Sequence, residues 1–415
     1  MINQRSIQAV SGSVLEHGFI KPQYNSYCFS QIPNTLLKLL GAGSRGLPDE
    51  CIQSGTYERV IFILVDGFGW KFLEQHQGRY PFLNRFFEQG VVSKLTSQFP
   101  STTAAHITTL CSNQVVGEHG VYEWFMYEPL VERVIAPLLY TYAGDKKVGS
   151  LADVIGPDEI FPQGFFFKEL QKHGIPCTIF QTESIANSIY SKWMFEGAKR
   201  VGYNDWPHAL TLLKEHLHSP GLFYLYFGDF DTEAHHHGVN SPACVKALDR
   251  CFHALEASLK ELPASTALVM TADHGMIDIN PLTTVYLNQR FPTLAAKLKK
   301  GSDGHALAPA GSCRDFFLHV EPNHLMDVFK ELQEALHESA WVCLTSELIE
   351  RGFFGPNGIS SRCQNRLGNI ALIAKGSNSF WWYEKGRFEQ TLHAMHGGLT
   401  PDELETIFLF LKSTP

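Results

Sequence analysis

The sequence predicts an α/β fold, with a central, mostly parallel sheet flanked by helices and a small inserted α/β subdomain. Short, almost wholly apolar segments alternate with segments of helical periodicity, as in sheets that are buried on both faces. Three apolar segments, Arg59 to Val65, Leu222 to Phe227 and Ala267 to Met270, run into acidic or histidine residues. Because open α/β sheets bind ligands beyond the carboxyl ends of their strands, these polar residues are expected to form a site there.

Composition narrows the class of protein. The chain has 415 residues, 44% of them hydrophobic, which is enough for one or two large cores. A net charge of -8 without a basic run argues against a nucleic-acid polymer or an anionic membrane as partner. Nine cysteines without a C-x-x-C pair favour free thiols in a reducing compartment. Because the sequence has neither a signal-like start nor a long apolar run, we expect a cytoplasmic protein without a membrane segment. Non-classical export and the oligomeric state stay open.

The first elements lead to the first acidic residue. Residues 1–55 are rich in Gly, Pro, Ser and Asn and are expected to drape over the fold as a lead-in segment. Arg59 to Val65 then forms a buried strand that ends at Asp66. Gly67 to Gly69 resembles the start of a dinucleotide fingerprint, but Phe72 stands at the third glycine position and argues against that interpretation. Helices are expected at Trp70 to Gln75 and at Phe82 to Glu88.

A cluster of hydroxyl residues follows the next strand, Val91 to Leu95. Ser101, Thr102 and Thr103 precede a helix that is expected to run to Leu110. Such residues are common helix N-caps, but a hydroxyl at a helix N-terminus is also well placed as a nucleophile beside an anionic substrate. Both interpretations stay open at this point. Further helix and strand segments are expected at Phe165 to His173, Cys177 to Phe180 and Ala209 to His218.

Two more strands deliver possible metal ligands. After Leu222 to Phe227, the four-residue spacing of Asp231 and His235 places both side chains on one face of a helical turn. A polar loop with surface histidines is the alternative. A long helix from Pro242 to Leu262 precedes the third strand, which leads to Asp273 and His274. Three strand ends of this kind favour a metal site over chance.

The C-terminal third is expected to leave the main sheet and return to it. Strands at Arg314 to Val320 and Trp341 to Leu344, with a helix at Leu325 to Leu336, indicate a small subdomain. The main sheet is expected to resume at Ile370 to Ala374, and Thr400 to Glu403 is expected to start the final helix. The predicted division is a lead-in segment at 1–55, a catalytic domain at 56–279 and 367–415, and an inserted subdomain at 280–366.

The possible ligands are carboxylates and imidazoles without cysteine, which suits zinc, with manganese as the alternative. They are too many for one tetrahedral ion, so two divalent ions are predicted. The set comprises Asp66, a hydroxyl at Thr102 or Thr103, Asp231, His235, Asp273, His274 and His396.

With these motifs the sequence resembles the alkaline phosphatase superfamily, and within it the type I phosphodiesterase/nucleotide pyrophosphatase family. The resemblance covers residues 58–410, and its motifs VDGFG, FPSTTAAH, EHGVY, DTEAHHHG, ADHGM and HGG occur in the family's order. The resemblance implies an alkaline-phosphatase-like fold. It also implies two zinc sites, one formed by Asp231, His235 and His396 and the other by Asp66, Asp273 and His274.

The resemblance also implies the nucleophile. Thr103 stands three residues after Pro100, as the family's nucleophile does, and would form a covalent phosphothreonine. A threonine hydroxyl is too weak an acid to attack phosphorus unaided, and a divalent cation would lower its pKa. The neighbouring His236 and His237 match no ligand position of the family.

The sequence departs from the family at three positions. Ala104 stands where nucleotide pyrophosphatases have an aromatic ring that stacks on the base. Trp124 stands where the family has an asparagine that donates to a phosphoryl oxygen, and Ala234 replaces a glycine. Trp124, His106 or Tyr122 is expected to bind the substrate in place of the asparagine.

The leading hypothesis is a two-metal phosphodiesterase or pyrophosphatase that acts on a small phosphoester. A phosphomonoesterase of the same superfamily is the first alternative. A metal-binding protein that has lost catalysis and serves in interactions is the second. The absence of a Cys-x-Pro-x-Arg motif argues against a sulfatase.

Overall fold

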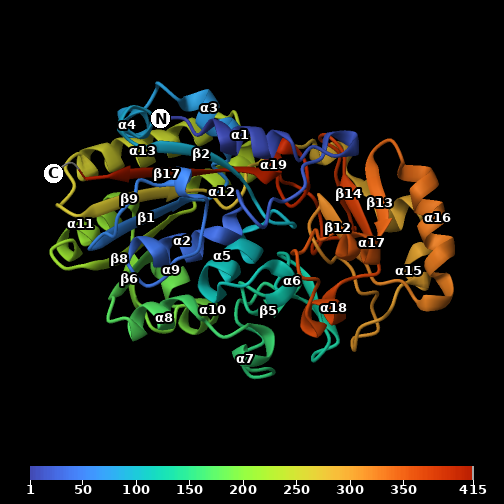
Figure 1. Ribbon diagram of the computed structural model, residues 1–415. Coiled ribbons are helices and arrows are strands. Elements are labelled where there is room, and N and C mark those ends of the chain that lie inside the picture. Colours follow the sequence, from blue (N-terminus) through green and yellow to red (C-terminus); the bar gives the residue numbers. More distant parts are fainter. Residues whose placement is uncertain (414–415) are drawn as a thin grey trace.

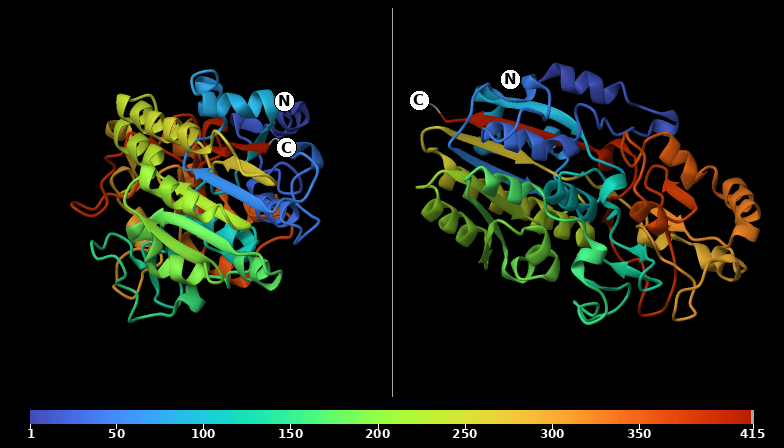
Figure 2. Two further views of the ribbon diagram at one scale, coloured as in Figure 1. Left: turned by 90° about the vertical axis from the view of Figure 1, so that its left-hand side faces the viewer. Right: turned by 60° about the horizontal axis from the view of Figure 1, so that its bottom comes forward.

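The computed structural model describes residues 1–413, which contain a seven-stranded main sheet between two layers of helices (Figures 1 and 2). The five strands from β9 to β7 are parallel, and β17 is antiparallel to both of its neighbours. The predicted α/β fold with a mostly parallel central sheet is confirmed. In spatial order the strands are β2 (Val91–Thr96), β17 (Glu405–Lys412), β9 (Thr266–Thr271), β1 (Arg59–Val65), β8 (Gly221–Phe227), β6 (Cys177–Thr182) and β7 (Lys199–Tyr203).

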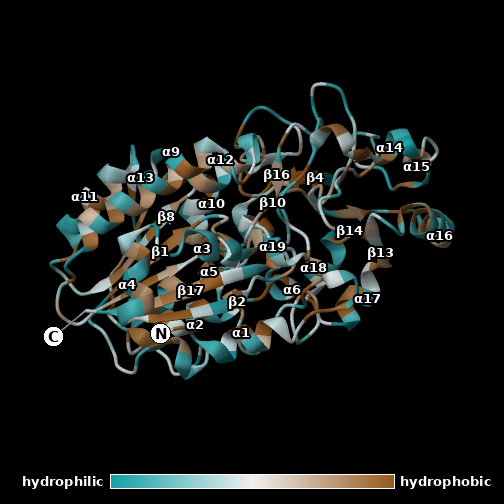
Figure 3. Cartoon of the chain, turned by 90° about the horizontal axis from the view of Figure 1, so that it is seen from above, coloured by the Kyte–Doolittle hydropathy of each residue, from teal (hydrophilic) through white to brown (hydrophobic). Residues whose placement is uncertain are grey.

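Each central strand is apolar on both faces because helices cover both faces. In β1, Phe62 packs into one core and the next residue, Ile63, into the other. Figure 3 shows β1 and β17 mostly in the hydrophobic colour. The first core contains residues of α2 (Ile32–Leu39), α5 (Thr103–Ser112), α8 (Phe166–Lys172) and α10 (Ile189–Met194). The second contains residues of α3 (Trp70–His76), α4 (Pro81–Gln89), α11 (Trp206–His216), α12 (Asp229–His237) and α13 (Pro242–Leu259).

A second, antiparallel sheet lies at the far end of the molecule, on the right of Figure 1. Its order is β12 (Asp315–Leu318), β14 (Ile370–Ala374) and β13 (Ala340–Leu344), and it has its own core, to which α16 (Leu325–Leu336) contributes. The prediction that Ile370 to Ala374 resumes the main sheet is therefore wrong. The strand is apolar throughout, as a strand of either sheet would be, and pairing with β12 and β13 decides its place.

The chain returns to the main sheet only at its end. The predicted final helix is a single turn, α19 (Pro401–Leu404), and β17 follows it directly. Along β17, Phe408 packs into the first core and Leu409 into the second. Burial on both faces of the sheet therefore overrides the helix start signal.

Shorter elements complete the chain. The N-terminal 55 residues include two helices, α1 (Gln4–Ser11) and α2, and Val10 and Phe29 of this segment are buried in the first core. Between residues 1 and 413 no helix has both the length and the apolar character that a membrane crossing requires. The nine cysteines are all free and buried.

The remaining helices are α6 (Val116–His119), α7 (Pro157–Ile160), α9 (Glu183–Ala186), α14 (Leu287–Arg290), α15 (Leu294–Lys297), α17 (Thr345–Glu350) and α18 (Ser361–Arg366). Three small ribbons are formed by β3 (Met126–Glu128), β4 (Arg133–Ala136) and β5 (Thr141–Tyr142), by β10 (Ile277–Asp278) and β16 (Ala394–Met395), and by β11 (Val285–Tyr286) and β15 (Phe380–Trp381).

Candidate active site

Three neighbouring strands, β9, β1 and β8, bring the acidic residues to one edge of the main sheet. Asp66 follows β1 directly, Asp273 follows β9 by two residues, and Asp231 lies in the first turn of α12, which begins just after β8. Because the three strands are parallel and adjacent, their carboxyl ends meet at this edge.

The first group of ligand atoms comprises Asp66, Asp273 and His274, which lie within 4.8 Å of one another. Nε2 of His274 is 3.4 Å from Oδ1 of Asp66 and 3.5 Å from Oδ2 of Asp273. Oδ1 of Asp273 accepts hydrogen bonds from the backbone N–H groups of Gly67 and His274. Oδ2 of Asp273 is buried and has no hydrogen-bond partner within residues 1–413, so it is free to bind a cation.

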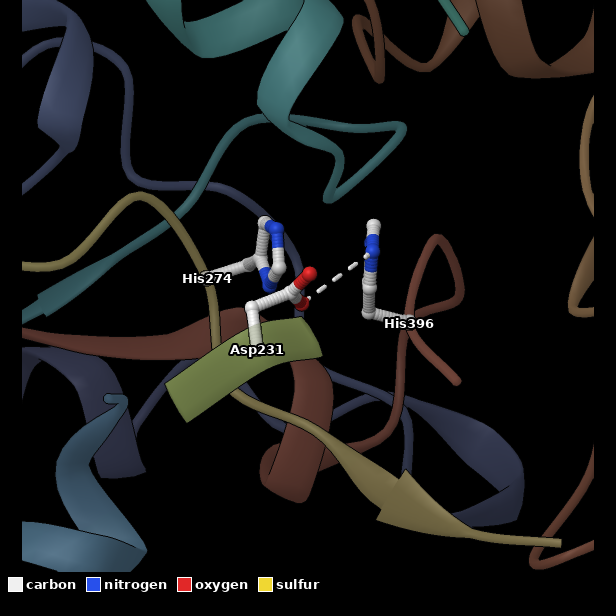
Figure 4. A group of neighbouring side chains, drawn as sticks. All are labelled: Asp231, His274 and His396. Carbon is white, nitrogen blue, oxygen red and sulfur yellow. Dashed lines mark ion pairs between the residues drawn. The ribbon is translucent and has the colours of Figure 1, made fainter. Parts of the chain in front are cut away.

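The second group comprises Asp231, His274 and His396, whose ligand atoms also lie within 4.8 Å of one another (Figure 4). Oδ1 of Asp231 lies 3.8 Å from Nε2 of His396. The rings of His274 and His396 are stacked with their centroids 3.7 Å apart, and His274 is a member of both groups. Nε2 of His235 lies 3.3 Å from Oδ2 of Asp231, one helical turn along α12.

The three histidines share one orientation. In each ring, Nδ1 lies within hydrogen-bond distance of a backbone carbonyl oxygen: 2.7 Å from Ala394 for His235, 3.0 Å from Gly275 for His274 and 2.9 Å from Ser101 for His396. A carbonyl only accepts, so Nδ1 carries the proton and the Nε2 lone pair is directed to the carboxylates. Metal-binding histidines are typically oriented in this way.

The pKa shifts of the carboxylates and histidines at this sheet edge also favour cation binding. Burial, together with the charges of Asp273 and Asp231, raises the pKa of Asp66 well above its usual range. Burial would also raise the pKa of Asp231, but its neighbour His235 outweighs this effect and lowers the pKa. Burial lowers the pKa of His396, which keeps the ring neutral and able to bind a metal. Buried carboxylates and neutral imidazoles are the donor set of zinc or manganese sites.

Thr103 is the hydroxyl residue that faces this edge. It is the first residue of α5, and its Oγ lies 3.1 Å from Nε2 of His274 and 3.4 Å from Oδ1 of Asp66. The hydroxyl of Ser101 donates to the carbonyl of Gly398, and Thr102 is buried at the N-cap position. The three hydroxyl residues are adjacent in the sequence, but their side chains have different surroundings in the structure.

A cavity of about 500 Å³ opens beside Thr103. Asp231, His235 and His396 are among the residues that line it. The rest of its lining comes from the segment after α6, from α12, and from the loops around Gly311 and between β15 and β16. These residues are Glu123, Trp124, Phe125, Thr232, His236, Gly311, Ser312, Cys313, Trp381, Arg387, Phe388, Glu389, Gln390, Thr391, Leu392 and Met395.

Of the three residues expected to bind substrate, Trp124 lines the cavity and the other two do not. His106 is fully buried, its Nε2 accepts from the N–H of Gln98, and its Nδ1 lies 2.7 Å from the carbonyl of Thr102. Tyr122 is also fully buried, and its hydroxyl donates to the carbonyl of Arg366. Neither side chain has a free donor that reaches the cavity.

The structure adds two features that sequence reasoning missed. The hydroxyl of Tyr226, near the carboxyl end of β8, donates to Oδ2 of Asp66. Glu123, at the cavity wall, is fully buried close to Asp315, and burial raises its pKa to about 8. Tyr226 could have been noticed as a polar ring at a strand end, but no local signal marks Glu123.

Known proteins share this fold. A family model described as type I phosphodiesterase/nucleotide pyrophosphatase matches residues 60–143 and 154–399. No curated protein matches the sequence significantly. The structure of murine ectonucleotide pyrophosphatase/phosphodiesterase 5 is 18% identical, with a TM-score of 0.64 over 85% of this chain and 88% of that one. An inactive variant of the murine protein, with a threonine replaced by alanine and in complex with AMP, is 17% identical, with a TM-score of 0.62 over 85% and 87%. Phosphonoacetate hydrolase from Sinorhizobium meliloti, in complex with phosphonoacetate, is 17% identical, with a TM-score of 0.61 over 88% and 93%.

Proposed function

Since the chain belongs to the type I phosphodiesterase/nucleotide pyrophosphatase family, whose members are metal-dependent phosphoester hydrolases, we propose that it cleaves a small phosphodiester with Thr103 as nucleophile. The observation that carries this proposal is the position of the Thr103 hydroxyl. Among three adjacent hydroxyl residues, it is the one directed at the buried group of Asp66 and His274. The inactive murine variant with a threonine replaced by alanine supports the same role.

The residues at the sheet edge suit two divalent cations, and we propose zinc. Asp66, Asp273 and His274 would hold one ion, and Asp231, His235 and His396 the other, with His274 close to both. When bound, the cations supply Lewis-acid stabilisation of the phosphoryl oxygens and a lower pKa for the nucleophile.

The protein's own groups perform the remaining tasks. The oxygen of Thr103 forms the new bond to phosphorus while the bond to the leaving alcohol breaks, which produces a phosphothreonine. Water then cleaves the phosphothreonine and restores the hydroxyl. Thr103 is the first residue of α5, so the N–H groups of the first helical turn and the helix dipole would favour the negative charge of a phosphoryl group there.

A diester is favoured over a monoester by the charges around the cavity. Among the lining residues, arginine and lysine are represented by Arg387 alone. Its guanidinium already donates to Glu384 and to the carbonyl of Ala143. The acidic side chain of Glu389 lines the same cavity. A monoester carries more negative charge than a diester and would find no free side-chain cation in this lining.

The test compares Thr103→Ala with Thr102→Ala. We expect Thr103→Ala to lower hydrolysis of bis-p-nitrophenyl phosphate by at least about 10³-fold, as loss of a covalent nucleophile does, with both metals retained. Thr102 makes no side-chain cap hydrogen bond, so Thr102→Ala should stay active. Turnover of p-nitrophenyl phosphate and metal content are measured on the same preparations. A fully active Thr103→Ala would refute the proposed nucleophile. A preference of the wild type for the monoester would refute the substrate class, and metal binding without turnover of either ester would favour an interaction protein.

A further inference from the structure

The position that follows the nucleophile offers no platform for a substrate ring in this chain. Ala104 is fully buried in α5, so neither its size nor its position allows contact with a group in the cavity. The cavity of about 500 Å³ is nevertheless within the range of small-molecule sites and exceeds the needs of a phosphate group alone. Some other part of its lining must contact the organic part of the substrate.

Aromatic side chains from two distant segments form that part of the lining. Trp124 and Phe125 follow α6, whereas Trp381 and Phe388 belong to β15 and the loop after it. The ring of Phe125 lies 6.0 Å from Trp381 and 6.0 Å from Phe388, between centroids. These contacts hold the three rings as one cluster, because offset and edge-on pairs at this distance attract each other.

Trp124 differs from the other three rings in its exposure. Phe388 is buried in the cluster, while 39% of Trp124 remains exposed. This exposed indole lines the same cavity as Thr103, and Trp side chains are common anchors of bound ligands. The backbone fixes the base of this segment, since the N–H of Gly311 donates to the carbonyl of Phe125 at 2.7 Å.

The charges of the lining limit the group that can bind. The guanidinium of Arg387 is held by Glu384 and by the carbonyl of Ala143, and the acidic side chain of Glu389 lines the same cavity as the rings. A second phosphate or a carboxylate would therefore meet the acidic side chain of Glu389 and no free side-chain cation in this lining. An uncharged, flat ring satisfies the aromatic surface and adds no charge.

Resting on the proposed function, we infer that Trp124, Phe125, Trp381 and Phe388 form the subsite for an uncharged, flat aromatic or heteroaromatic ester group of the substrate. Trp124 is its main specificity determinant, because it offers the largest exposed ring face at the cavity. This subsite takes the place of the ring that Ala104 lacks.

The test measures binding rather than turnover. Diphenyl phosphate and dimethyl phosphate have the same charge and differ in their rings, and their dissociation constants are measured by calorimetry with the metal-loaded Thr103→Ala protein. We expect diphenyl phosphate to bind more tightly by at least about tenfold, since one good ring contact is worth about 1.4 kcal/mol. Adding Trp124→Ala should reduce this ratio by about fivefold to tenfold.

Matched variants separate the possible outcomes. Phe165 is an exposed ring outside the cavity, so Phe165→Ala should keep the ratio. Trp381→Leu provides a second probe of the cluster and should also reduce the ratio. An unchanged ratio in both the Trp124→Ala and the Trp381→Leu proteins would overturn the subsite. Tighter binding of methylphosphocholine than of diphenyl phosphate would overturn the uncharged class, because the cavity would then be selecting a cation. Full activity of Thr103→Ala with a normal binding ratio would refute the nucleophile and leave the subsite intact.

Discussion

Tyr226→Phe tests whether a residue outside the predicted ligand set affects metal binding by the group of Asp66, Asp273 and His274. The Tyr226 hydroxyl donates to Oδ2 of Asp66, whose side chain is almost fully buried. Burial and the negative charge of Asp66 raise the pKa of Tyr226 well above its usual value, so the hydroxyl keeps its proton and remains a donor. Phenylalanine preserves the ring and removes that single hydrogen bond.

The expected magnitude follows from the loss of a hydrogen bond to a buried carboxylate, about 1.5–3 kcal/mol. Part of this loss appears as weaker metal binding, because groups that orient metal ligands typically change affinity by about 10- to 100-fold. Zinc affinity is measured by competition with a chromophoric chelator. Hydrolysis of bis-p-nitrophenyl phosphate at saturating zinc is measured in parallel, and kcat should fall more than KM rises.

The same strand supplies a matched control. Tyr224 lies two residues earlier on β8, is fully buried, and its hydroxyl has no hydrogen-bond partner within residues 1–413. Tyr224→Phe should therefore leave zinc affinity unchanged and be neutral or slightly stabilising. If Tyr226→Phe bound zinc as tightly as Tyr224→Phe, the argument that Tyr226 orients Asp66 would be refuted.

Three further predictions concern the site and its support. His235→Ala should lower both metal content and activity, whereas His237→Ala, which changes a side chain that is 55% exposed, should retain both by metal analysis and turnover. Glu123 has a raised pKa of about 8, so the folded protein binds its proton more tightly than the unfolded chain does, and stability falls as pH rises from about 4.5 to 8. The unfolding free energy of Glu123→Gln, relative to wild type, should therefore rise over this window by at most about 1.4 kcal/mol per pH unit in denaturant titrations, and a flat difference would contradict the assignment. Arg314 donates to both carboxylate oxygens of Glu403 at 2.9 Å with both side chains fully buried. Arg314→Met should cost about 3–5 kcal/mol by leaving the buried charge of Glu403 without its cation. The double variant with Glu403→Leu should recover only part of this loss in the same assay, because Gly398 and Thr400 also donate to Glu403.

Two sequence-based predictions were wrong because a local pattern does not specify which distant segment a strand or helix contacts. Ile370 to Ala374 is an apolar strand in either sheet, and its local pattern does not specify a pairing partner. Thr400 to Glu403 carries a helix start signal that the structure uses for one turn only, because the following residues are buried on both faces of the main sheet. Both outcomes depend on contacts between residues that are distant in the chain.

The sequence by itself determined the α/β class, and it indicated that Asp66, Asp231 and Asp273 follow buried strands. These properties are local, since the apolar pattern of a strand and the residue after it can be read without knowing the partner strand. Only the tertiary structure placed β9, β1 and β8 side by side, brought the Thr103 hydroxyl, which the family resemblance had singled out, to Asp66, and made His274 common to both ligand groups. It also joined Trp124 to Trp381 across one cavity and set the Tyr226 hydroxyl on Asp66. Side-chain direction and long-range pairing depend on burial and hydrogen bonding over the whole fold, which no local pattern encodes.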